Sequence, residues 1–389
     1  ITFKLNFPPE VNLFRDGAAI ECFITGEEPV KGVLLNLDGK NGEFRLFAPD
    51  FPDWIEDDGV GIKLAPDTRT SSIMKKVMQG LEKNKPLFQL FEQLHAANPV
   101  AASSAPAAIP SLDFRNKKLN ASQQQAVSAV VQNENICIVH GPPGTGKTTT
   151  LIEAILQLIK AGEKVVVAAP SNTAVDHLAK GLIQQGVNLL RVGNISKVDE
   201  QIFAHTPEGK LKTSNAQKEI KQLKIRAEEF RKMALKYKRS FGKAEREQRS
   251  LLFKEVKNIR TEIKKLQHYN EEKLFAEATV IAGTPIGLYD AGINHLHFQT
   301  LVIDEAGQCM EPLAWCIFPL ADKIVLAGDH WQLPPTVLSR EAAALGFNES
   351  ILERAISKTK HVILLNTQYR MRQAIAGFSS HYIYTNLLQ

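Results

Sequence analysis

The first 66 residues consist of short, strand-like apolar runs separated by turn-forming pairs. The segment LLNLDGKNGEFRLF places Asp38-Gly39 and Asn41-Gly42 between apolar runs. Asp-Gly and Asn-Gly pairs are typical of the tight turns of β-hairpins. The pattern predicts a small β-barrel or sandwich, and we take residues 1–66 as a β-barrel domain.

Two helices and a linker are expected next. In SSIMKKVMQGLEKN and PLFQLFEQLH the apolar residues recur three and four positions apart, with one break around Lys85-Pro86. This spacing predicts two helices joined at a kink. The segment from Pro99 to Ser111, PVAASSAPAAIPS, lacks the large apolar residues needed for packing and is typical of a linker. Residues 67–116 are therefore predicted to form a helical stalk followed by an Ala/Pro linker.

From residue 117 the pattern changes to short, fully apolar runs that alternate with helical stretches. The runs NICIVHG, KVVVAAP, QTLVIDEA and DKIVLAGD have the strand pattern, whereas TTTLIEAILQLIKAG and NTAVDHLAKGLIQQG have helical spacing. Strands that are apolar throughout are typical of parallel sheets covered by helices on both faces. We predict one α/β domain built from residues 117–195 and 275–360.

The alternation is interrupted by residues 196–274, where Lys, Glu, Gln and Arg dominate and sparse apolar residues keep a helical spacing. This predicts a long antiparallel helical hairpin inserted into the α/β domain. The chain carries a net charge of +5, but the segment from Lys210 to Lys273 holds 20 Lys and Arg against 9 Glu, which gives +11 and leaves −6 for the rest. A concentrated basic block indicates a polyanionic partner, although Lys/Glu-rich helices often have merely solvated faces.

Composition narrows the class of protein. The 389 residues, 44% of them hydrophobic, are enough for two or three domains. The sequence has no apolar run of about eighteen residues and no charged-then-apolar leader, so we predict neither a membrane span nor a signal peptide. The four cysteines form no CxxC pair, which indicates a reducing compartment, cytoplasmic or, in a eukaryote, nuclear, and no structural zinc.

The segment GPPGTGKT follows a predicted strand and opens a predicted helix, which is the context of a P-loop. Its glycines allow successive backbone N–H groups to face phosphates at a helix N-terminus, where the dipole favours anions. Lys147 would reach the β- and γ-phosphates of ATP, and Thr148 would hold Mg²⁺. The expected cofactor-binding residues here are Gly141, Pro142, Pro143, Gly144, Thr145, Gly146, Lys147, Thr148 and Thr149.

Two further strand ends carry polar side chains. Asp304 and Glu305 end the run LVIDE, where Asp304 suits a Mg²⁺ role and Glu305 the role of a general base for water. Asp329 ends KIVLAGD, and Gln332 after it could sense the γ-phosphate. The alternative without a function is an ordinary acidic strand end for Asp304-Glu305 and a rigid Pro-Pro turn for the segment with Gln332. The presence of a P-loop makes both alternatives less favoured.

Other candidate contacts lie at turns. Gln123 in LNASQQQAV has the donor and acceptor needed to bind an adenine edge, unless this segment serves only as a helix cap. Ser171, Asn172 and Thr284 lie at strand-to-helix turns, where hydroxyls, amides and N–H groups can hold a sugar-phosphate backbone without recognising bases. They too have capping as an alternative.

Taken in order, LNASQ, GPPGTGKT, APSNTAVD, DEAGQ, GDHWQLPP and QYRM resemble the motifs of the up-frameshift-like branch of superfamily 1B helicases, with the immunoglobulin-mu-binding-protein helicase close in pattern. The match runs from about Leu119 to Leu388. The resemblance implies a RecA-like P-loop NTPase sheet, an N-terminal β-barrel on a stalk and an inserted helical domain. It also implies that residues 361–389 start a second RecA-like domain.

The resemblance implies a role for each matching residue. Gln123 and Tyr369 would contact the adenine, whereas Lys147, Asp304, Glu305, Gln332 and Arg370 would form the catalytic set, with Arg370 reaching the γ-phosphate. Thr148 and Asp304 would hold Mg²⁺. Ser171, Asn172 and Thr284 would line the path of the nucleic acid.

Three positions depart from the family pattern. Ala306-Gly307 stands where Cys-Ala or Ala-Ala is frequent, Trp331 where lysine is frequent, and Arg372 where histidine is frequent. Trp331 either stacks on a base or packs at the domain interface, and packing is favoured.

The resemblance implies an ATP-dependent, 5′-to-3′ helicase or translocase on single-stranded DNA or RNA, acting as a monomer without a membrane partner. With only the start of a second domain, the chain itself is expected to be nearly inactive. Two alternatives remain open: a nucleic-acid-stimulated ATPase that remodels nucleoprotein without unwinding, and a basic nucleic-acid-binding module.

Overall fold

A computed structural model describes the chain except for residues 7–13, 15–16, 49–51, 58, 66–67, 97–111, 133–134, 195–196, 213–214, 236–242, 338, 360–361 and 389. The predicted linker from Pro99 to Ser111 lies outside the described residues. The chain divides into two compact units, one made of Ile1–Phe88 with Asn194–Val198, and one made of Gln89–Gly193 with Asp199–Gln389. Each unit is described by itself below. The domain boundaries expected from the sequence remain predictions.

The first unit contains a five-stranded antiparallel sheet in the order β1-β4-β3-β2-β5. Ile20, Cys22, Leu34 and Phe44 form its buried core, because they share one face of the alternating strands. The predicted N-terminal sheet is therefore confirmed, whereas the described residues show no pairing of β1 with β5 that would close a barrel. The strands are β1 (Thr2–Lys4), β2 (Ala19–Phe23), β3 (Val30–Asp38), β4 (Asn41–Leu46) and β5 (Gly61–Leu64).

One of the two predicted hairpin turns is correct and the other is wrong. Asp38 pairs with Asn41 across a two-residue turn, and Gly39 has the positive φ of +58° that such a turn favours. Gly42 instead lies inside β4, opposite Phe3. A Cβ atom on Gly42 would approach the Phe3 ring to 2.4 Å, so this glycine makes room for an aromatic ring.

The expected pair of helices is present. Helix α1 spans Thr68–Gly80, and α2 spans Lys85–His95 after a 3-10 turn at Leu81–Lys83. Pro86 lies in the first turn of α2, where its missing N–H would have no helical partner anyway. The predicted break at Lys85-Pro86 is thus the beginning of the second helix.

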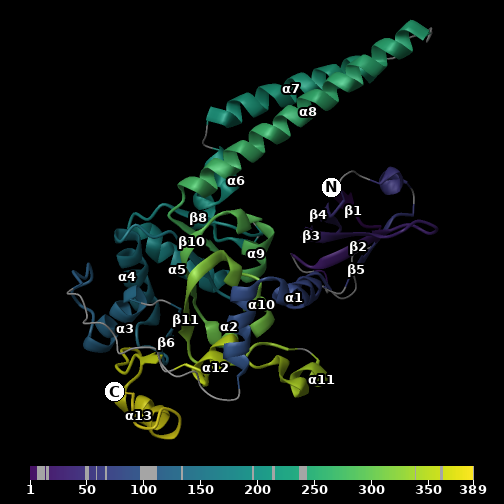
Figure 1. The fold of residues 1–389 in the computed structure, drawn as a ribbon. Coiled ribbons are helices and arrows are strands. Elements are labelled where there is room, and N and C mark those ends of the chain that lie inside the picture. Colours follow the sequence, from purple (N-terminus) through teal and green to yellow (C-terminus); the bar gives the residue numbers. More distant parts are fainter. Residues whose placement is uncertain are drawn as a thin grey trace. The chain divides into compact units, whose positions relative to one another are not determined.

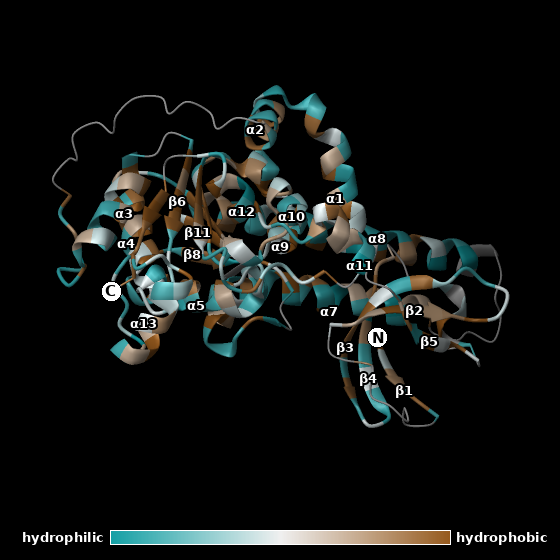
Figure 2. Cartoon of the chain, turned by 90° about the horizontal axis from the view of Figure 1, so that it is seen from below, coloured by the Kyte–Doolittle hydropathy of each residue, from teal (hydrophilic) through white to brown (hydrophobic). Residues whose placement is uncertain are grey.

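The second unit is built on a seven-stranded parallel sheet in the order β12-β6-β11-β10-β7-β9-β8. Strands β6, β7, β8 and β9 are buried along their whole length, and helices lie on either side of the apolar strands β6 and β11 (Figure 2). The predicted α/β fold is confirmed. The strands are β6 (Ile136–His140), β7 (Val165–Ala168), β8 (Leu189–Arg191), β9 (Val280–Gly283), β10 (Phe298–Ile303), β11 (Ala321–Gly328) and β12 (Val362–Leu364).

The helices around this sheet come from the same alternation. None of the helices in the described ranges is long and apolar enough to cross a membrane. They are α3 (Ala121–Gln132), α4 (Lys147–Lys160), α5 (Asn172–Gln184), α9 (Pro285–Asp290), α10 (Glu311–Trp315), α11 (Arg340–Ala342), α12 (Ile351–Ile356) and α13 (Gln373–Tyr382).

Strand β12 belongs to this sheet and not to a separate second sheet. The sequence assigns it to the start of a second domain, but it pairs in parallel with β6, with Val362 opposite Ile138 and Leu364 opposite His140. Leu365 continues the contact, because its N–H donates to the carbonyl of His140 over 2.8 Å. The segment that follows β12 therefore starts beside the end of β6.

The basic segment forms the expected helical insertion between β8 and β9 (Figure 1). Helix α6 (Pro207–Lys212) leads into α7 (Asn215–Leu235) and α8 (Lys243–Glu277), which lie side by side as a hairpin. Ile220 and Ala227 of α7 pack with Ile259 and Ile263 of α8. Much of the remaining surface of this pair is polar, although the apolar side chains of Ile225, Leu251 and Tyr269 are more than half exposed.

Candidate nucleotide and nucleic-acid site

Three neighbouring strands bring the predicted nucleotide residues to one edge of the large sheet. β6, β11 and β10 are adjacent and parallel, so their carboxyl ends meet at the same edge. The glycine-rich loop follows β6, Asp329 follows β11, and Asp304 follows β10. The N–H of Gly141 donates to the carbonyl of Gly328 over 2.9 Å, which joins the first loop to the second strand.

The glycine-rich loop has a backbone that only glycine accommodates. Gly144 and Gly146 have φ values of +78° and +77°, in the left-handed region. A Cβ atom on Gly144 would also lie 2.6 Å from the Cβ of Arg370, and one on Gly146 would lie 2.5 Å from Nε2 of Gln123. Gly146 is the residue before α4, so the loop leads directly into a helix N-terminus suited to phosphate.

Lys147 and Glu305 form an ion pair at the mouth of this loop. Their Nζ and Oε1 atoms are 3.0 Å apart, and the side chains are 11% and 33% exposed. Glu305 has φ 53° and ψ 37°, a left-handed conformation that is uncommon for a non-glycine residue and recurs at functional sites. The lysine is thus held by a partner that an anionic ligand could replace.

Asp304 is a buried carboxylate whose negative charge is only partly balanced by hydrogen bonds and nearby positive charge. It is 4% exposed, and its Oδ1 accepts a hydrogen bond of 2.9 Å from the N–H of Glu305. Burial raises the pKa of Asp304 to about 6, and the nearby Lys147 charge offsets this only partly. A hard divalent cation such as Mg²⁺ prefers carboxylate and hydroxyl oxygens, so Asp304 and the half-buried Thr148 fit the donor set expected for it.

Asp329 has the opposite environment. Its Oδ1 accepts hydrogen bonds from Nε2 of His140 (3.0 Å) and the N–H of Trp331 (3.1 Å). Its Oδ2 accepts from Nε2 of Gln332 (2.9 Å) and the hydroxyl of Tyr384 (2.6 Å). Burial alone would raise the pKa of Asp329, but these hydrogen bonds lower it to about 2. The carboxylate therefore fixes Gln332, the expected γ-phosphate sensor, to the rest of the site.

Trp331 is partly packed and partly exposed. Its ring centroid lies 5.1 Å from that of His140, 4.5 Å from that of His330 and 5.2 Å from that of Tyr384, yet the residue is 44% exposed. The ring therefore packs on aromatic neighbours of its own unit, whereas packing at a domain interface and stacking on a base both stay predictions.

Gly307 has a steric reason to replace the bulkier residue of the family pattern. A Cβ atom at this position would lie 2.6 Å from the carbonyl oxygen of Asp329. The turn after Asp304 thus packs directly on the backbone that follows β11.

The segment with Tyr369 and Arg370 lies against the glycine-rich loop. The N–H of Tyr369 donates to the carbonyl of Gly144 over 2.9 Å, and its hydroxyl accepts from Nδ2 of Asn120 over 2.8 Å. Gln368 shapes this turn, because its Oε1 accepts from the N–H groups of Arg370 (3.0 Å) and Met371 (2.7 Å). Tyr369 and Arg370 are both exposed beside the loop.

Gln123 already ties its helix to the same loop. Its Nε2 donates to the carbonyl of Thr145 over 3.0 Å, and its Oε1 accepts from the N–H of Asn120 over 3.0 Å. An amide has two N–H donors and two acceptor lone pairs, so one of each remains for an adenine edge. Gln123 is 5% exposed.

The rest of the loop has structural contacts of its own. The hydroxyl of Thr145 donates to the carbonyl of Pro142 over 2.8 Å, while Pro143 is half-buried. Thr149 is exposed and lines a cavity of about 340 Å³ together with Glu153 and Gln185.

The three residues expected to contact nucleic acid lie at two helix N-termini. Ser171 caps α5, with its Oγ accepting from the N–H of Ala174 over 3.1 Å, and Asn172 is the first residue of that helix. Thr284 caps α9, with its Oγ1 accepting from the N–H of Gly287 over 3.2 Å. The capping alternative is therefore true for Ser171 and Thr284.

Sequence reasoning missed two residues of this site. The sequence predicts Asp329 only as the acid that ends a strand, whereas it contacts four partners. The sequence predicts no role for Arg191, which is fully buried and bound to Asn172. The only sequence signal for Arg191 is an arginine that ends an apolar strand, LLR.

A parallel sheet with a glycine loop between β6 and α4, and with acidic residues at the two neighbouring strand ends, defines a P-loop NTPase domain of the RecA-like class. The family model described as AAA domain matches residues 118–340, and a second AAA-domain model matches residues 347–389. The chain belongs to this family, within the superfamily 1B helicases.

Similar proteins support this placement. The DNA-binding protein SMUBP-2 of Mesocricetus auratus is 34% identical over 331 residues, which are 83% of this chain and 32% of that protein. The ATP-dependent helicase NAM7 of Saccharomyces cerevisiae is 34% identical over 277 residues, 70% of this chain and 26% of that protein. An uncharacterized ATP-dependent helicase of Methanocaldococcus jannaschii is 28% identical over 387 residues, 90% of this chain and 57% of that protein. The chain thus spans about a quarter to just over half the length of these relatives.

Proposed function

We propose that this chain supplies the first nucleotide-binding domain of an ATP-dependent helicase or translocase that moves 5′ to 3′ on single-stranded DNA or RNA. The observation that carries the proposal is the edge where β6, β11 and β10 end, with the Lys147–Glu305 pair of 3.0 Å beside the buried Asp304. Relatives named as ATP-dependent helicases support the same reading.

The chemistry follows from groups at this edge. When ATP enters, Lys147 exchanges Glu305 for the β- and γ-phosphates, and Glu305 is released to polarise the attacking water. Thr148 and Asp304 would hold Mg²⁺, which would neutralise phosphate charge. A cation there would also compensate the buried carboxylate of Asp304 and favour its ionised form.

The remaining nucleotide contacts come from segments next to the loop. Gln123 binds the adenine edge with its remaining donor and acceptor, and the exposed ring of Tyr369 stacks on the base. Arg370 and Gln332 reach the γ-phosphate. Gln332 is fixed through Asp329, so its amide is held ready before nucleotide arrives.

Nucleic acid binds at the N-termini of α5 and α9 in this proposal. Ser171, Asn172 and Thr284 present a hydroxyl, an amide and backbone N–H groups, which bind phosphates without recognising base sequence. The basic hairpin of α7 and α8 adds long-range attraction for the same polyanion.

The test is nucleic-acid-stimulated release of phosphate by the full-length protein that carries this chain. We expect Lys147→Ala to remove it, whereas Lys323→Ala, a lysine on the same sheet that pairs with Glu163, leaves it intact. A strand-displacement assay on the same samples separates unwinding from nucleoprotein remodelling. Unaltered ATP-dependent strand affinity in Lys147→Ala would favour a simple binding module and contradict the proposal.

A further inference from the structure

A buried arginine lies under the two helix N-termini that are proposed to hold nucleic acid. Arg191 ends β8, and its side chain is fully enclosed, with 0% exposure. Burying a guanidinium is costly unless it is paired and hydrogen-bonded. The hydrogen-bond partners of Arg191 therefore indicate its role in the fold.

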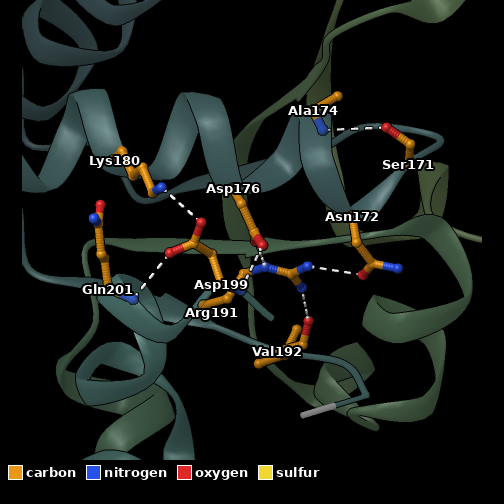
Figure 3. A network of polar contacts seen from close by, with 9 residues as sticks. All are labelled: Ser171, Asn172, Ala174, Asp176, Lys180, Arg191, Val192, Asp199 and Gln201. Carbon is orange, nitrogen blue, oxygen red and sulfur yellow. Dashed lines mark hydrogen bonds and ion pairs between the residues drawn. The ribbon is translucent and has the colours of Figure 1, made fainter. Parts of the chain in front are cut away.

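The guanidinium reaches three groups at once (Figure 3). Its Nε donates to Oδ1 of Asp176 over 2.7 Å, and Nη2 donates to Oδ1 of Asn172 over 2.9 Å. Its Nη1 donates to the carbonyl of Val192. The charge is neutralised by Asp176, so the bond to Asn172 is an additional contact and not the ion pair itself.

This contact fixes the direction of the Asn172 amide. A guanidinium has only donors, so an amide that faces it must present its oxygen. The NH₂ group of Asn172 then points away from the buried arginine, as its nitrogen does in Figure 3. Asn172 is half-buried and follows the exposed cap Ser171, so this donor lies at the N-terminus of α5.

The same arginine also contacts the backbone beside the first turn of α9, where Thr284 lies. Val192 and Gly193 pack on the first turn of α9, because a Cβ atom on Gly287 would lie 3.2 Å from Cα of Gly193 and 3.5 Å from the carbonyl oxygen of Val192. The N–H of Gly287 is also the one that binds Oγ1 of Thr284. Arg191 therefore binds a carbonyl that lies beside the first turn of α9.

A third connection leads to the start of the helical insertion. Oδ2 of Asp176 accepts from the N–H of Asp199 over 2.9 Å. Asp199 in turn pairs with Lys180 over 2.7 Å and accepts from the N–H of Gln201 over 2.9 Å (Figure 3). The network joins α5 to the segment that enters the insertion.

We propose that Arg191 is a positioning residue for nucleic-acid binding: it holds the Asn172 amide with its oxygen inward, so that the NH₂ group faces a phosphate of the bound strand. This inference rests on the proposed function, because it deepens the site at Ser171, Asn172 and Thr284. Arg191 itself is enclosed and does not touch the strand.

The first experiment compares two substitutions at Asn172 in the 389-residue chain, by fluorescence anisotropy with labelled oligo-dT and oligo-U at low salt. Asn172→Ala is expected to weaken binding about tenfold, the loss of one hydrogen bond to a charged group. Asn172→Asp keeps an oxygen toward Arg191 and places the other where the NH₂ group was, so it should weaken binding further. Asp binding as tightly as Asn would overturn the inference.

The second experiment tests whether Arg191 acts through Asn172. Arg191→Lys keeps the charge beside Asp176 but loses the fork that reaches Asn172. Its loss of strand affinity should match that of Asn172→Ala, and the double variant should lose no more than either, because the two residues form one contact. Additive losses would overturn the inference.

Two measurements distinguish positioning of the Asn172 amide from a general structural role of Arg191. Binding of a fluorescent ATP analogue should be unchanged in Arg191→Lys, and a proportional fall in both affinities would indicate a merely structural arginine. Lys323→Arg, the same kind of cation exchange in the Glu163 pair of this sheet, is the matched control and should alter neither.

Each failure has a distinct meaning. If Arg191→Lys does not fold, the Ala and Asp comparison at Asn172 still decides the direction of the amide. If the unsubstituted chain binds neither oligonucleotide, the proposed function fails and this inference fails with it. If the chain binds and the Asn172 variants bind equally well, the inference and the proposed contact at Asn172 fail, while the ATP-dependent activity is untouched.

Discussion

Asp304 and Asp329 follow neighbouring strands and are almost equally buried, at 4% and 3% exposure, yet their pKa values move in opposite directions. Burial raises the pKa of Asp304 to about 6, against one backbone hydrogen bond and the nearby charge of Lys147. Burial would also raise the pKa of Asp329, but four hydrogen bonds outweigh it and lower the pKa to about 2.

The difference in pKa indicates which of the two carboxylates is suited to bind a ligand. Asp329 has all its acceptor positions in use, so it serves as a rigid connection between β6, Gln332 and Tyr384. Asp304 is left without enough positive charge around it, which makes a bound cation favourable. Two adjacent acidic strand ends therefore have separate tasks, one structural and one for binding.

The largest expected effect that separates the two is on catalysis. Asp304→Asn should reduce nucleic-acid-stimulated ATP hydrolysis by the full-length protein by about 10² to 10³, the loss typical of one group that stabilises transition-state charge. Asp322→Asn, an exposed acid on β11 that pairs with His297, is the control and should leave the rate unchanged. Normal turnover by the Asp304→Asn protein would contradict the assignment of Asp304 to ligand binding.

The next effect is on stability, where the two acids should differ in sign. A pKa displacement of about two units corresponds to roughly 3 kcal/mol. At pH 7 Asp304→Asn should therefore raise the free energy of unfolding by up to about 3 kcal/mol, whereas Asp329→Asn should lower it by a similar amount. Urea unfolding of the 389-residue chain measures both, and shifts of the same sign would break the comparison.

The pH dependence sharpens the same point. The folded-state pKa of Asp304, about 6, lies above the ordinary value of 3.8, so the folded chain binds the extra proton and this group's contribution to stability falls as pH rises from about 4 to 6. The folded-state pKa of Asp329, about 2, lies below 3.8, so its contribution is present above 3.8 and is lost as pH falls through 2. The difference in unfolding free energy between the unsubstituted chain and Asp304→Asn should therefore shrink toward pH 4.

The smallest effect is expected from a single partner of Asp329. Tyr384→Phe removes one hydrogen bond of four and should cost about 1 kcal/mol in the free energy of unfolding. Asp304 should be unaffected, so the stability gained by Asp304→Asn should add to this loss in the double variant. Strong non-additivity in urea unfolding would show that the two strand ends are coupled and not separate.

Much of this architecture could be predicted, because it depends on local patterns. The parallel sheet follows from fully apolar runs, and the glycine loop follows from its place between a strand and a helix. The helical insertion also shows in sequence, since Lys and Glu interrupt the strand pattern over about eighty residues. The pairing of β12 with β6 could not be predicted, because a three-residue strand has no pattern that says which sheet it joins.

The polar networks could not be predicted, because they join residues that are far apart along the chain. Asp329 binds His140, 189 positions away, and Tyr384, 55 positions away. Arg191 ends an apolar strand, and the sequence around it does not show that Asp176 lies close enough to neutralise its charge or that Asn172 accepts its hydrogen bond. Such contacts depend on the order of the strands in the sheet, which the sequence pattern leaves open.

The most direct test of the account is the proton balance of nucleotide binding. Isothermal titration calorimetry of the chain with ATP at saturating Mg²⁺, at pH 6 in two buffers of different ionisation enthalpy, measures the protons released. Because Asp304 is partly protonated at pH 6 and becomes ionised beside the cation, the unsubstituted chain should release protons that Asp304→Asn does not. Equal proton release by both chains, or binding that is indifferent to Mg²⁺, would contradict the assignment of this strand end to the nucleotide.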